Sequence, residues 1–355
     1  MKIIHTADIH FGSKIENKFD YQRSKIRQSE IKETFKRMID YAKNNDIQHI
    51  ILAGDIFDNQ NPRQEDRDYF YDLIEHNSNI VFYYLRGNHD LYEMETEKNP
   101  FDNLKRFSRN FFKSYDASDN VVISGIEIGI NNLNSPDLRL NKEKINIVVL
   151  HGDIQNNTDR YYINIKSLQN KNIDYLALGH IHNAYGGILD DRGIFQYSGC
   201  LEPRGFDEIG KKGFYVINIE NKKVNHEFIP FSKRTIDVKE IDVTGLSKAL
   251  EIYHKIKTEV EIKKENIYRF ILTGTSSVDL NKITDDVKNY FNNDCFLVDI
   301  KNATKPFIDY AQYNNDLTLV GNFIKVVKND PTLSEDEKQE IIQIGITALK
   351  GENIS

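Results

Sequence analysis

The stretch "IDYLALGHIH" (Ile173–His182) is an apolar run that ends in two histidines separated by one residue. Such a run predicts a buried β-strand. Side chains at positions i and i+2 of an extended segment point to the same side, so His180 and His182 can direct two imidazoles at one place. That arrangement suits a metal ion, but taken alone it also suits a polar strand end that faces solvent. Other parts of the chain must decide between the two interpretations.

Four earlier segments have the same apolar character and also predict buried strands. They are Lys2–His5, His49–Leu52, Ile80–Leu85 and Ile145–Leu150. Apolar residues at helical spacing lie between them. The predicted helices are Ile31–Ala42, Arg67–Glu75 and Asp102–Phe112. Because strands alternate with helices, we expect a layered α/β domain, to which three later strands add a strand-rich second half. Those strands are expected at Ile194–Tyr197, Gly213–Ile219 and Val224–Pro230.

The character of the sequence changes after residue 232. Residues 233–304 follow a strand-helix-strand-helix-strand order, which predicts a separate small α/β domain. Residues 305–355 contain two amphipathic helical patterns between Leu317 and Leu349, the second opened by a capping-box spacing at Ser334 and Glu337. We therefore expect three parts, residues 1–232, 233–304 and 305–355.

The composition excludes several classes of protein. A net charge of −7 over 355 residues argues against a protein that holds DNA by a global positive field, although local basic patches remain compatible with it. No apolar run reaches the ~20 residues of a membrane span, and the first residues do not resemble a signal peptide, so we expect a soluble, cytoplasmic protein with no membrane partner. Cys200 and Cys295 are far apart and predict neither a disulfide framework nor a thiolate metal site.

Polar residues follow each of the five predicted strands of the first part. They are Asp8, His10, Asp55, Asp58, Asn88, His89, Asp90, His151, His180 and His182. Because ligand sites of α/β sheets lie at the carboxyl ends of the strands, we expect these side chains to meet. Glycines 54, 87 and 179 stand directly before polar residues, as tight turns and close approach would require.

The candidate ligands are imidazoles, carboxylates and one amide, with no thiolate. Such a set fits Mn²⁺, Fe²⁺ or Zn²⁺ better than Ca²⁺ or a structural zinc site. Seven ligands, drawn from these ten polar residues, are too many for one catalytic ion with an open position. Two ions about 4 Å apart that share a carboxylate would use all seven, and this arrangement serves in-line phosphoryl chemistry. The sequence therefore predicts two divalent ions.

The ordered motifs resemble those of calcineurin-like metallophosphoesterases. These motifs are Asp-x-His at 8–10, Gly-Asp-x-x-Asp at 54–58, Gly-Asn-His-Asp at 87–90, His151, and Gly-His-x-His at 179–182. More narrowly, four segments are similar to the SbcD-type nuclease subunit of DNA double-strand-break repair complexes. They are "IIHTADIHFGSK" (3–14), "RQSEIKETFKRMIDYAK" (27–43), "IILAGDIFDNQNP" (50–62) and "YSGCLEPRGFDEIGKKGFYVI" (197–217). The resemblance implies a mixed α/β fold, a two-sheet sandwich flanked by helices, with a small α/β capping domain and C-terminal helices.

The resemblance also implies roles for individual residues. One ion would be held by Asp8, His10 and His182 and the other by Asn88, His151 and His180, with Asp55 bridging the two. His89 matches the catalytic histidine of the family, which acts on the leaving oxygen. Asp90 would orient that imidazole, or alternatively stabilise a turn. The chain has Asp58 at a position where archaeal and eukaryotic relatives often carry histidine.

The function implied is a Mn²⁺-dependent DNA exonuclease and endonuclease in double-strand-break repair. The capping domain would help to position DNA, and four basic residues are candidates for contacts to its backbone. These are Lys14, Arg23, Arg27 and Arg204. Family members work with an SMC-like ABC ATPase of the SbcC type, docked through C-terminal helices, and often form homodimers. Two alternatives stay open, namely a phosphoesterase acting on small molecules such as cyclic nucleotides or on proteins, and a catalytically silent binding subunit.

Overall fold

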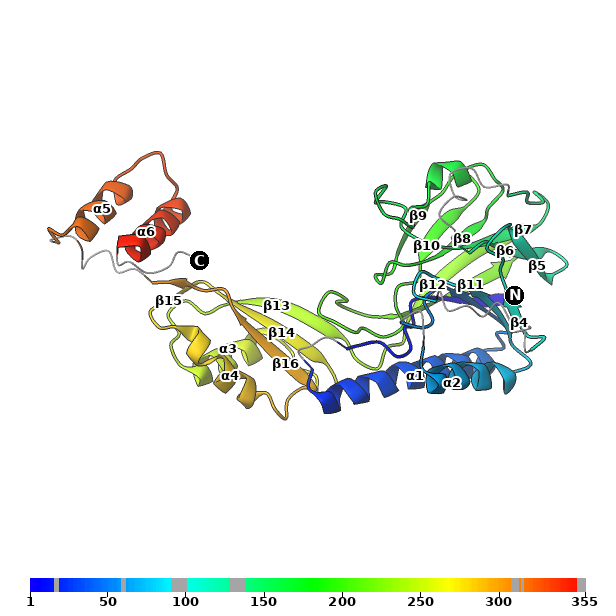
Figure 1. Cartoon of the computed structure of the whole chain (residues 1–355), viewed down its shortest axis with the longest axis horizontal. Coiled ribbons are helices and arrows are strands. Elements are labelled where there is room, and N and C mark those ends of the chain that lie inside the picture. Colours follow the sequence, from blue (N-terminus) through cyan, green and yellow to red (C-terminus); the bar gives the residue numbers. More distant parts are fainter. Residues whose placement is uncertain are drawn as a thin grey trace. The chain divides into compact units, whose positions relative to one another are not determined.

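The computed structural model describes residues 1–15, 19–58, 62–90, 101–127, 138–307, 313 and 316–349. The chain divides into two compact units, Met1–Asp237 and Val238–Ser355, and each is described by itself. Most elements of both units are labelled in Figure 1. None of the helices in the described ranges is long and apolar enough to cross a membrane.

The first sheet of the first unit has six strands in the order β12-β11-β1-β2-β3-β4. Strands β1 to β4 run parallel to one another, whereas β11 pairs antiparallel with β1, and β12 with β11. The strands are β1 (Lys2–Thr6), β2 (His49–Ala53), β3 (Val81–Leu85), β4 (Leu104–Arg106), β11 (Gly213–Glu220) and β12 (Lys223–Pro230).

The second sheet also has six strands, in the order β5-β6-β7-β8-β10-β9. Its four inner strands are parallel, and both edge strands are antiparallel to their neighbours. The strands are β5 (Lys113–Ser118), β6 (Val121–Gly125), β7 (Ile145–His151), β8 (Tyr175–Gly179), β10 (Ile194–Tyr197) and β9 (Tyr185–Ile188). Every residue of β7 is buried, which explains its continuous apolar character.

The two sheets pack face to face around one buried core. Ile51 and Leu85 of the first sheet share this core with Val149 and Ala177 of the second. Helices α1 (Tyr21–Asn44) and α2 (Gln64–Glu75) pack against the first sheet, as ring contacts from α2 to β3 and from α1 to β11 indicate (Figure 1). The opposite face of the second sheet is covered by its own apolar cluster, to which a short 3₁₀ helix (Ile165–Leu168) contributes Leu168. The prediction of a mixed α/β two-sheet sandwich flanked by helices is confirmed.

The second unit is built on a three-stranded sheet in the order β13-β14-β16. The strands are β13 (Ile236–Asp242), β14 (Ile267–Thr273) and β16 (Leu297–Asn302), and β14 and β16 are parallel. Helices α3 (Ala249–Glu259) and α4 (Thr284–Tyr290), the latter after a short 3₁₀ helix (Leu280–Lys282), share the core of this sheet. Two short strands, β15 (Thr275–Ser276) and β17 (Lys305–Pro306), pair beside it. Helices α5 (Leu319–Lys328) and α6 (Glu335–Leu349) follow and pack through Ile324, Val327 and Ile342.

The prediction of a helix over Asp102–Phe112 is wrong. The structure has β4 in this segment, and Leu104 pairs with Phe82 of β3. The apolar spacing of the segment looks helical, but its residues serve different surroundings. Phe107 is buried between the two sheets, whereas Phe111 keeps 61% of its surface exposed. Pairing with the edge of β3 therefore determines the structure of this segment, and its weak helical pattern does not.

Both cysteines lie in described parts of the chain. They are buried and are not joined to each other by a disulfide, as the sequence predicted. Each contributes volume to the interior of its unit, and burial raises the pKa of the Cys200 thiol well above its ordinary value. Neither belongs to a group of metal-ligating side chains found among the described residues.

Candidate metal centre

The predicted site residues follow the carboxyl ends of β1, β2 and β3 in one sheet and of β7 and β8 in the other. Four of them have a positive φ, a region that residues other than glycine rarely adopt. They are Asp8 (53°), His10 (54°), Asp55 (53°) and His180 (100°). Local backbone strain of this kind persists only where the surrounding structure enforces it, and it concentrates at functional sites.

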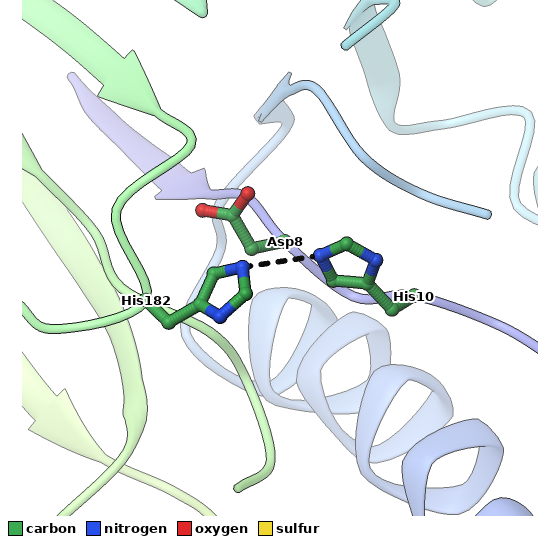
Figure 2. A group of neighbouring side chains, drawn as sticks. All are labelled: Asp8, His10 and His182. Atoms are coloured by element: carbon green, nitrogen blue, oxygen red, sulfur yellow. Dashed lines mark hydrogen bonds between the residues drawn. The ribbon is translucent and has the colours of Figure 1, made fainter. Parts of the chain in front are cut away.

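One cluster consists of Asp8, His10 and His182, whose ligand atoms lie within 4.8 Å of one another. Figure 2 shows the two imidazoles facing each other beside the carboxylate, with Nε2 of His10 3.3 Å from Nε2 of His182. The Asp8 carboxylate is held by the backbone N–H of His180, which lies 3.0 and 3.1 Å from its two oxygens. Residues 172 positions apart in the sequence thus form one compact N/O donor set.

A second cluster joins Asp55, His151 and His180, also within 4.8 Å. The side-chain oxygen of Asn88 lies 2.9 Å from Nε2 of His151 and 3.0 Å from Nδ1 of His180. Asp55 Oδ2 lies 3.3 Å from Nε2 of His151 and 3.8 Å from Nε2 of His10. Asp55 therefore faces both clusters, and its position between them is what a shared carboxylate requires.

Polar groups on the far side of the rings orient the imidazoles. His151 Nδ1 donates to the backbone carbonyl of Ala53 at 2.9 Å. Nδ1 of His10 lies 3.0 Å from Asp58 Oδ1, and Nδ1 of His182 lies 2.7 Å from Glu208 Oε1. Metal-ligating histidines use their second nitrogen in this way, which leaves Nε2 as the ligand atom. The donor set therefore fits divalent metal ions.

Charge and burial oppose each other in the second cluster. Burial acts to lower the pKa of His151, but the carboxylate of Asp55 outweighs it and raises this pKa to about 9. Burial acts to raise the pKa of Asp55, and the His151 imidazole holds it well below its ordinary value instead. The pKa of His180 is lowered by burial and by the nearby His151. At neutral pH the pair is thus a carboxylate beside an imidazolium, and a divalent ion would take the place of that proton.

Two glycines make this packing possible. A Cβ at Gly54 would lie 2.2 Å from His151 Nδ1, and a Cβ at Gly87 would lie 2.2 Å from Asp55 Oδ1. Both distances are far below van der Waals contact, so no larger residue fits without movement of these groups. The expectation that glycine allows close approach at these positions is confirmed.

His89 lies beside the first cluster, with its ring 5.1 Å from the ring of His10. Its Nδ1 lies 3.0 Å from the backbone carbonyl of Asp58, and since a carbonyl only accepts, Nδ1 carries the hydrogen. The backbone N–H of His89 donates to Asp55 Oδ1 at 2.9 Å. The imidazole is thus oriented by the Asp58 carbonyl, with Nε2 left for a substrate.

Asp90 does not have the orienting role expected for it. Its buried carboxylate accepts hydrogen bonds from the backbone N–H groups of Ile56, Phe57 and Gly87, at 2.8 to 3.1 Å. Burial and the nearby Asp55 raise its pKa to about 7. The alternative interpretation of Asp90 as a residue that stabilises a turn agrees with these contacts, because they tie the loop after β2 to the loop after β3.

The sequence model for calcineurin-like phosphoesterases matches residues 1–184 of the 355-residue chain. The chain belongs to the calcineurin-like phosphoesterase family. The match contains both clusters, from Asp8 to His182. Metallophosphoesterases use divalent metal ions, and both clusters could bind such ions.

The amino-acid sequence of the chain is also similar, along most of its length, to those of several known proteins. It is 24% identical to the DNA double-strand break repair protein Mre11 of Sulfolobus acidocaldarius, over 97% of this chain and 94% of that protein. It is 24% identical to the SbcD subunit of the SbcCD nuclease of Staphylococcus epidermidis, over 78% of this chain and 80% of that protein. An uncharacterised metallophosphoesterase of Bacillus subtilis, YhaO, is 25% identical over 78% and 72% of the two chains. A solved structure of a dimetal phosphatase from Danio rerio aligns with a TM-score of 0.42 and 12% sequence identity. The alignment covers 62% of this chain and 93% of that chain.

The basic residues expected to contact DNA have different surroundings in the phosphoesterase. Lys14 is exposed, and Arg23 keeps 36% of its side-chain surface exposed beside Asp20. Arg27 is fully buried and pairs with Glu30 and with Glu202, so the expectation that it contacts a DNA backbone is not met. An arginine whose guanidinium is enclosed by two carboxylates cannot reach a phosphate.

Arg204 also departs from its expected role as a surface contact. Only 14% of its side chain is exposed, and its guanidinium donates to Asp58 at 3.0 Å and to Glu208 at 2.9 Å. Glu208, which contacts His182, carries no signal in the sequence that marks it as a site residue. It lies in the segment 197–217, which is similar to nuclease subunits, but a single acidic residue there does not indicate a contact with His182.

Proposed function

We propose that the phosphoesterase is a divalent-metal-dependent DNA nuclease, with exonuclease and endonuclease activity, that acts in double-strand-break repair and uses Mn²⁺. One observation carries the proposal: two ligand clusters meet at Asp55 in a chain whose relatives are named as a break-repair protein and a nuclease subunit. Hydrolysis of a phosphodiester by a pair of ions needs two closely spaced ions with open coordination positions, and a carboxylate shared between them would hold them close together. The donor set of carboxylates, imidazoles and one amide is suited to Mn²⁺.

Each of the two ions would have its own ligands. Asp8, His10 and His182 would hold one ion. Asn88, His151 and His180 would hold the other, with Asp55 between them. Bound ions would supply Lewis-acid stabilisation of the phosphate charge and would lower the pKa of the attacking water. The protein supplies preformed ligands, four of them buried and three partly buried, so little reorganisation is needed when the substrate binds.

His89 would act on the leaving oxygen of the phosphodiester. Its Nδ1 is committed to the Asp58 carbonyl, so Nε2 is the atom that can donate a proton to that oxygen. The half-buried ring lies beside His10, at the border of the first cluster. General acid catalysis by a positioned side chain contributes about 10²- to 10⁴-fold in rate, which sets the size of the loss expected without it.

DNA would be held by its backbone, with the exposed Lys14 and the partly exposed Arg23 among the contacts. We propose that residues 233–304 form the capping domain that positions the DNA, after the nuclease domain 1–232. Electrostatic contacts release counterions, so the affinity for a labelled duplex should fall as the salt concentration rises. An affinity that does not respond to salt would contradict this account of DNA binding.

Residues 305–355 would bind a partner, an SMC-like ABC ATPase. Helices α5 and α6 pack on each other, yet Leu319 and Val326 remain largely exposed. A chain that ends at residue 307 should no longer co-purify with the ATPase, whereas the full chain should. Retention of the partner by the shortened chain would exclude docking through these helices.

The test of the proposed function is the degradation of end-labelled duplex DNA with Mn²⁺ or Mg²⁺, with a small phosphodiester alongside. Mn²⁺ should support DNA cleavage, and His89→Gln should lower the rate by about 10²- to 10⁴-fold. His76→Gln, at an exposed position at the end of α2, is the matched control and should cleave like wild type. Cleavage of the small diester alone would instead assign the enzyme to small-molecule phosphoesterases.

A further inference from the structure

The two imidazoles of the first cluster have matching surroundings. His10 and His182 face each other through Nε2, and each presents Nδ1 to a carboxylate. The carboxylate is Asp58 for His10, at 3.0 Å, and Glu208 for His182, at 2.7 Å. A carboxylate in its ionised form can only accept, so it favours a hydrogen on the Nδ1 that it faces; the guanidinium of Arg204, 3.1 Å from Nδ1 of His182, donates to Glu208. In the metal-free protein one Nε2 also carries a hydrogen, which it donates to the other Nε2, and a metal ion bound by both rings would replace that hydrogen.

A single guanidinium joins the two carboxylates. Arg204 donates from one terminal nitrogen to Asp58 Oδ1 at 3.0 Å and from the other to Glu208 Oε1 at 2.9 Å. The backbone N–H of Arg204 donates to the second oxygen of Glu208 at 2.5 Å. Because arginine does not lose its proton in proteins, it keeps both the partly exposed Asp58 and the buried Glu208 ionised. The positive charge of Arg204 also offsets part of the cost of placing two carboxylates close together.

The backbone of His182 is held by the same segment of chain that provides Arg204 and Glu208. Lys212 donates through Nζ to the carbonyl of His182 at 3.0 Å and to the side chain of Asn183 at 2.6 Å. The backbone N–H of Cys200 donates to the same carbonyl at 3.1 Å. The ring and the main chain of His182 are therefore both fixed by residues 200–212.

This segment is in turn anchored to α1. Glu202 accepts from Arg27 at 2.8 Å and from Thr34 at 2.7 Å, and it also receives the backbone N–H of Lys233. All of these contacts lie within the first unit. The buried Arg27 therefore has a structural explanation: it holds the segment that orients a ligand.

We infer that Asp58, Arg204 and Glu208 form a positioning group that presents Nε2 of His10 and of His182 to one metal ion. The inference rests on the proposed metal-dependent function and adds three residues that act on the ligands of this ion; one of them, Asp58, also lies in a third group of possible ligands with His10 and His89. Asp58 and Glu208 each set the tautomer of one imidazole, and Arg204 fixes the two carboxylates relative to each other. In the second cluster a backbone group takes the place of the carboxylate, because Nδ1 of His151 donates to the carbonyl of Ala53. The positioning group therefore acts on one ion of the two.

The first test is a calorimetric titration of the metal-free full-length protein with Mn²⁺. Wild type should bind two ions, and Glu208→Gln should weaken one of them by about 10- to 100-fold while the other is unchanged. Asp58→Asn should weaken the same ion. Glu220→Gln, an exposed glutamate at the end of β11, is the matched control and should bind like wild type. Two ions bound with unchanged affinity by Glu208→Gln would overturn the inference, whereas no binding by wild type would overturn the proposed function instead.

The second test needs no substitution and no metal, so it remains decisive if a variant does not fold. Nitrogen NMR of histidine rings in the metal-free wild type reports which ring nitrogen carries the hydrogen. His10 and His182 should carry it on Nδ1. A hydrogen on Nε2 alone in either ring would overturn the positioning role of the facing carboxylate, whatever the protein does with DNA.

Discussion

The side-chain oxygen of Asn88 lies 2.9 Å from Nε2 of His151, across 63 residues of sequence. Nδ1 of His151 is already a donor to Ala53, so a neutral His151 presents a lone pair to the amide oxygen. Two acceptors at this distance repel unless a proton or a metal ion lies with them. Burial acts to lower the pKa of His151, but Asp55 raises it. In the metal-free protein a proton on Nε2 of His151 therefore lies between this nitrogen and the amide oxygen.

Replacement of Asn88 by alanine should therefore remove a ligand without disturbing the fold. We expect Asn88→Ala to weaken one of two bound Mn²⁺ ions by at least about tenfold and to lower DNA cleavage accordingly. Calorimetric titration measures the first effect and end-labelled duplex DNA the second. Asn225→Ala, at an exposed position of β12, is the control. Asn88→Ala protein that binds both ions like wild type would show that the amide oxygen is not a ligand.

Gly87 offers a test of how closely the loops are packed. In Gly87→Ala the new Cβ would lie 2.2 Å from Asp55 Oδ1 and 2.6 Å from its backbone nitrogen, so Asp55 must move. A displacement of about 1 Å in an active site costs on the order of 10²-fold in rate, and we expect a loss of this size in cleavage. Gly245→Ala adds a Cβ that would meet nothing within 4 Å, so its cost is confined to the left-handed backbone at that position (φ 79°), and it should keep its activity. Equal activity of both variants would contradict the close approach.

The general layout of the site could be predicted from the sequence because it follows from topology. Parallel strands of one sheet end at one edge, so the polar residues after β1, β2 and β3 form one group and those at the ends of β7 and β8 another, and the face-to-face packing of the two sheets brings the groups together. Glycine before Asp55 and before Asn88 indicated close approach, and the structure confirms it. The assignment of each ligand to a particular ion stays a prediction.

The surroundings of the ligands could not be predicted in the same way. Arg204 lies 22 residues after His182, and Glu208 lies further along still, so no local pattern connects either residue with the imidazole that it contacts. Arg27 occupies a basic stretch that looked like a surface, yet tertiary packing against Glu202 buries it. Such contacts depend on where distant loops lie, and one sequence carries little information about that.

The buried ion pairs of Arg27 make a prediction about stability. Removal of one partner from a buried ion pair costs about 3–5 kcal/mol, because the remaining charges lose their compensation. Arg27→Ala should therefore lower the free energy of unfolding by about that amount, as Glu30 and Glu202 stay buried. Arg23→Ala, one turn earlier on α1, removes a partly exposed pair with Asp20 and should cost less than about 1 kcal/mol. Denaturant unfolding measures both, and similar losses would contradict the burial of Arg27.

His5 makes a prediction about pH. It lies in β1, and its Nδ1 is 3.0 Å from the hydroxyl of Tyr175. Burial lowers the pKa of His5 from 6.5 to about 3. The unfolded chain therefore takes up a proton on His5 below pH 6.5, while the folded chain does not until about pH 3. Since the unfolded state then binds more protons, His5 lowers the stability of the fold as the pH falls.

The size of this effect follows from proton linkage. Each unit of pH below the unfolded pKa costs at most about 1.4 kcal/mol per group. In His5→Asn, whose amide keeps a polar group near the Tyr175 hydroxyl, this cost should disappear. Denaturant unfolding of metal-free wild type and variant, from neutral pH down to about 5.5, should show a steeper loss in wild type by about 1 kcal/mol. All other histidines are common to both proteins, so parallel pH profiles would mean that His5 is protonated in the folded state.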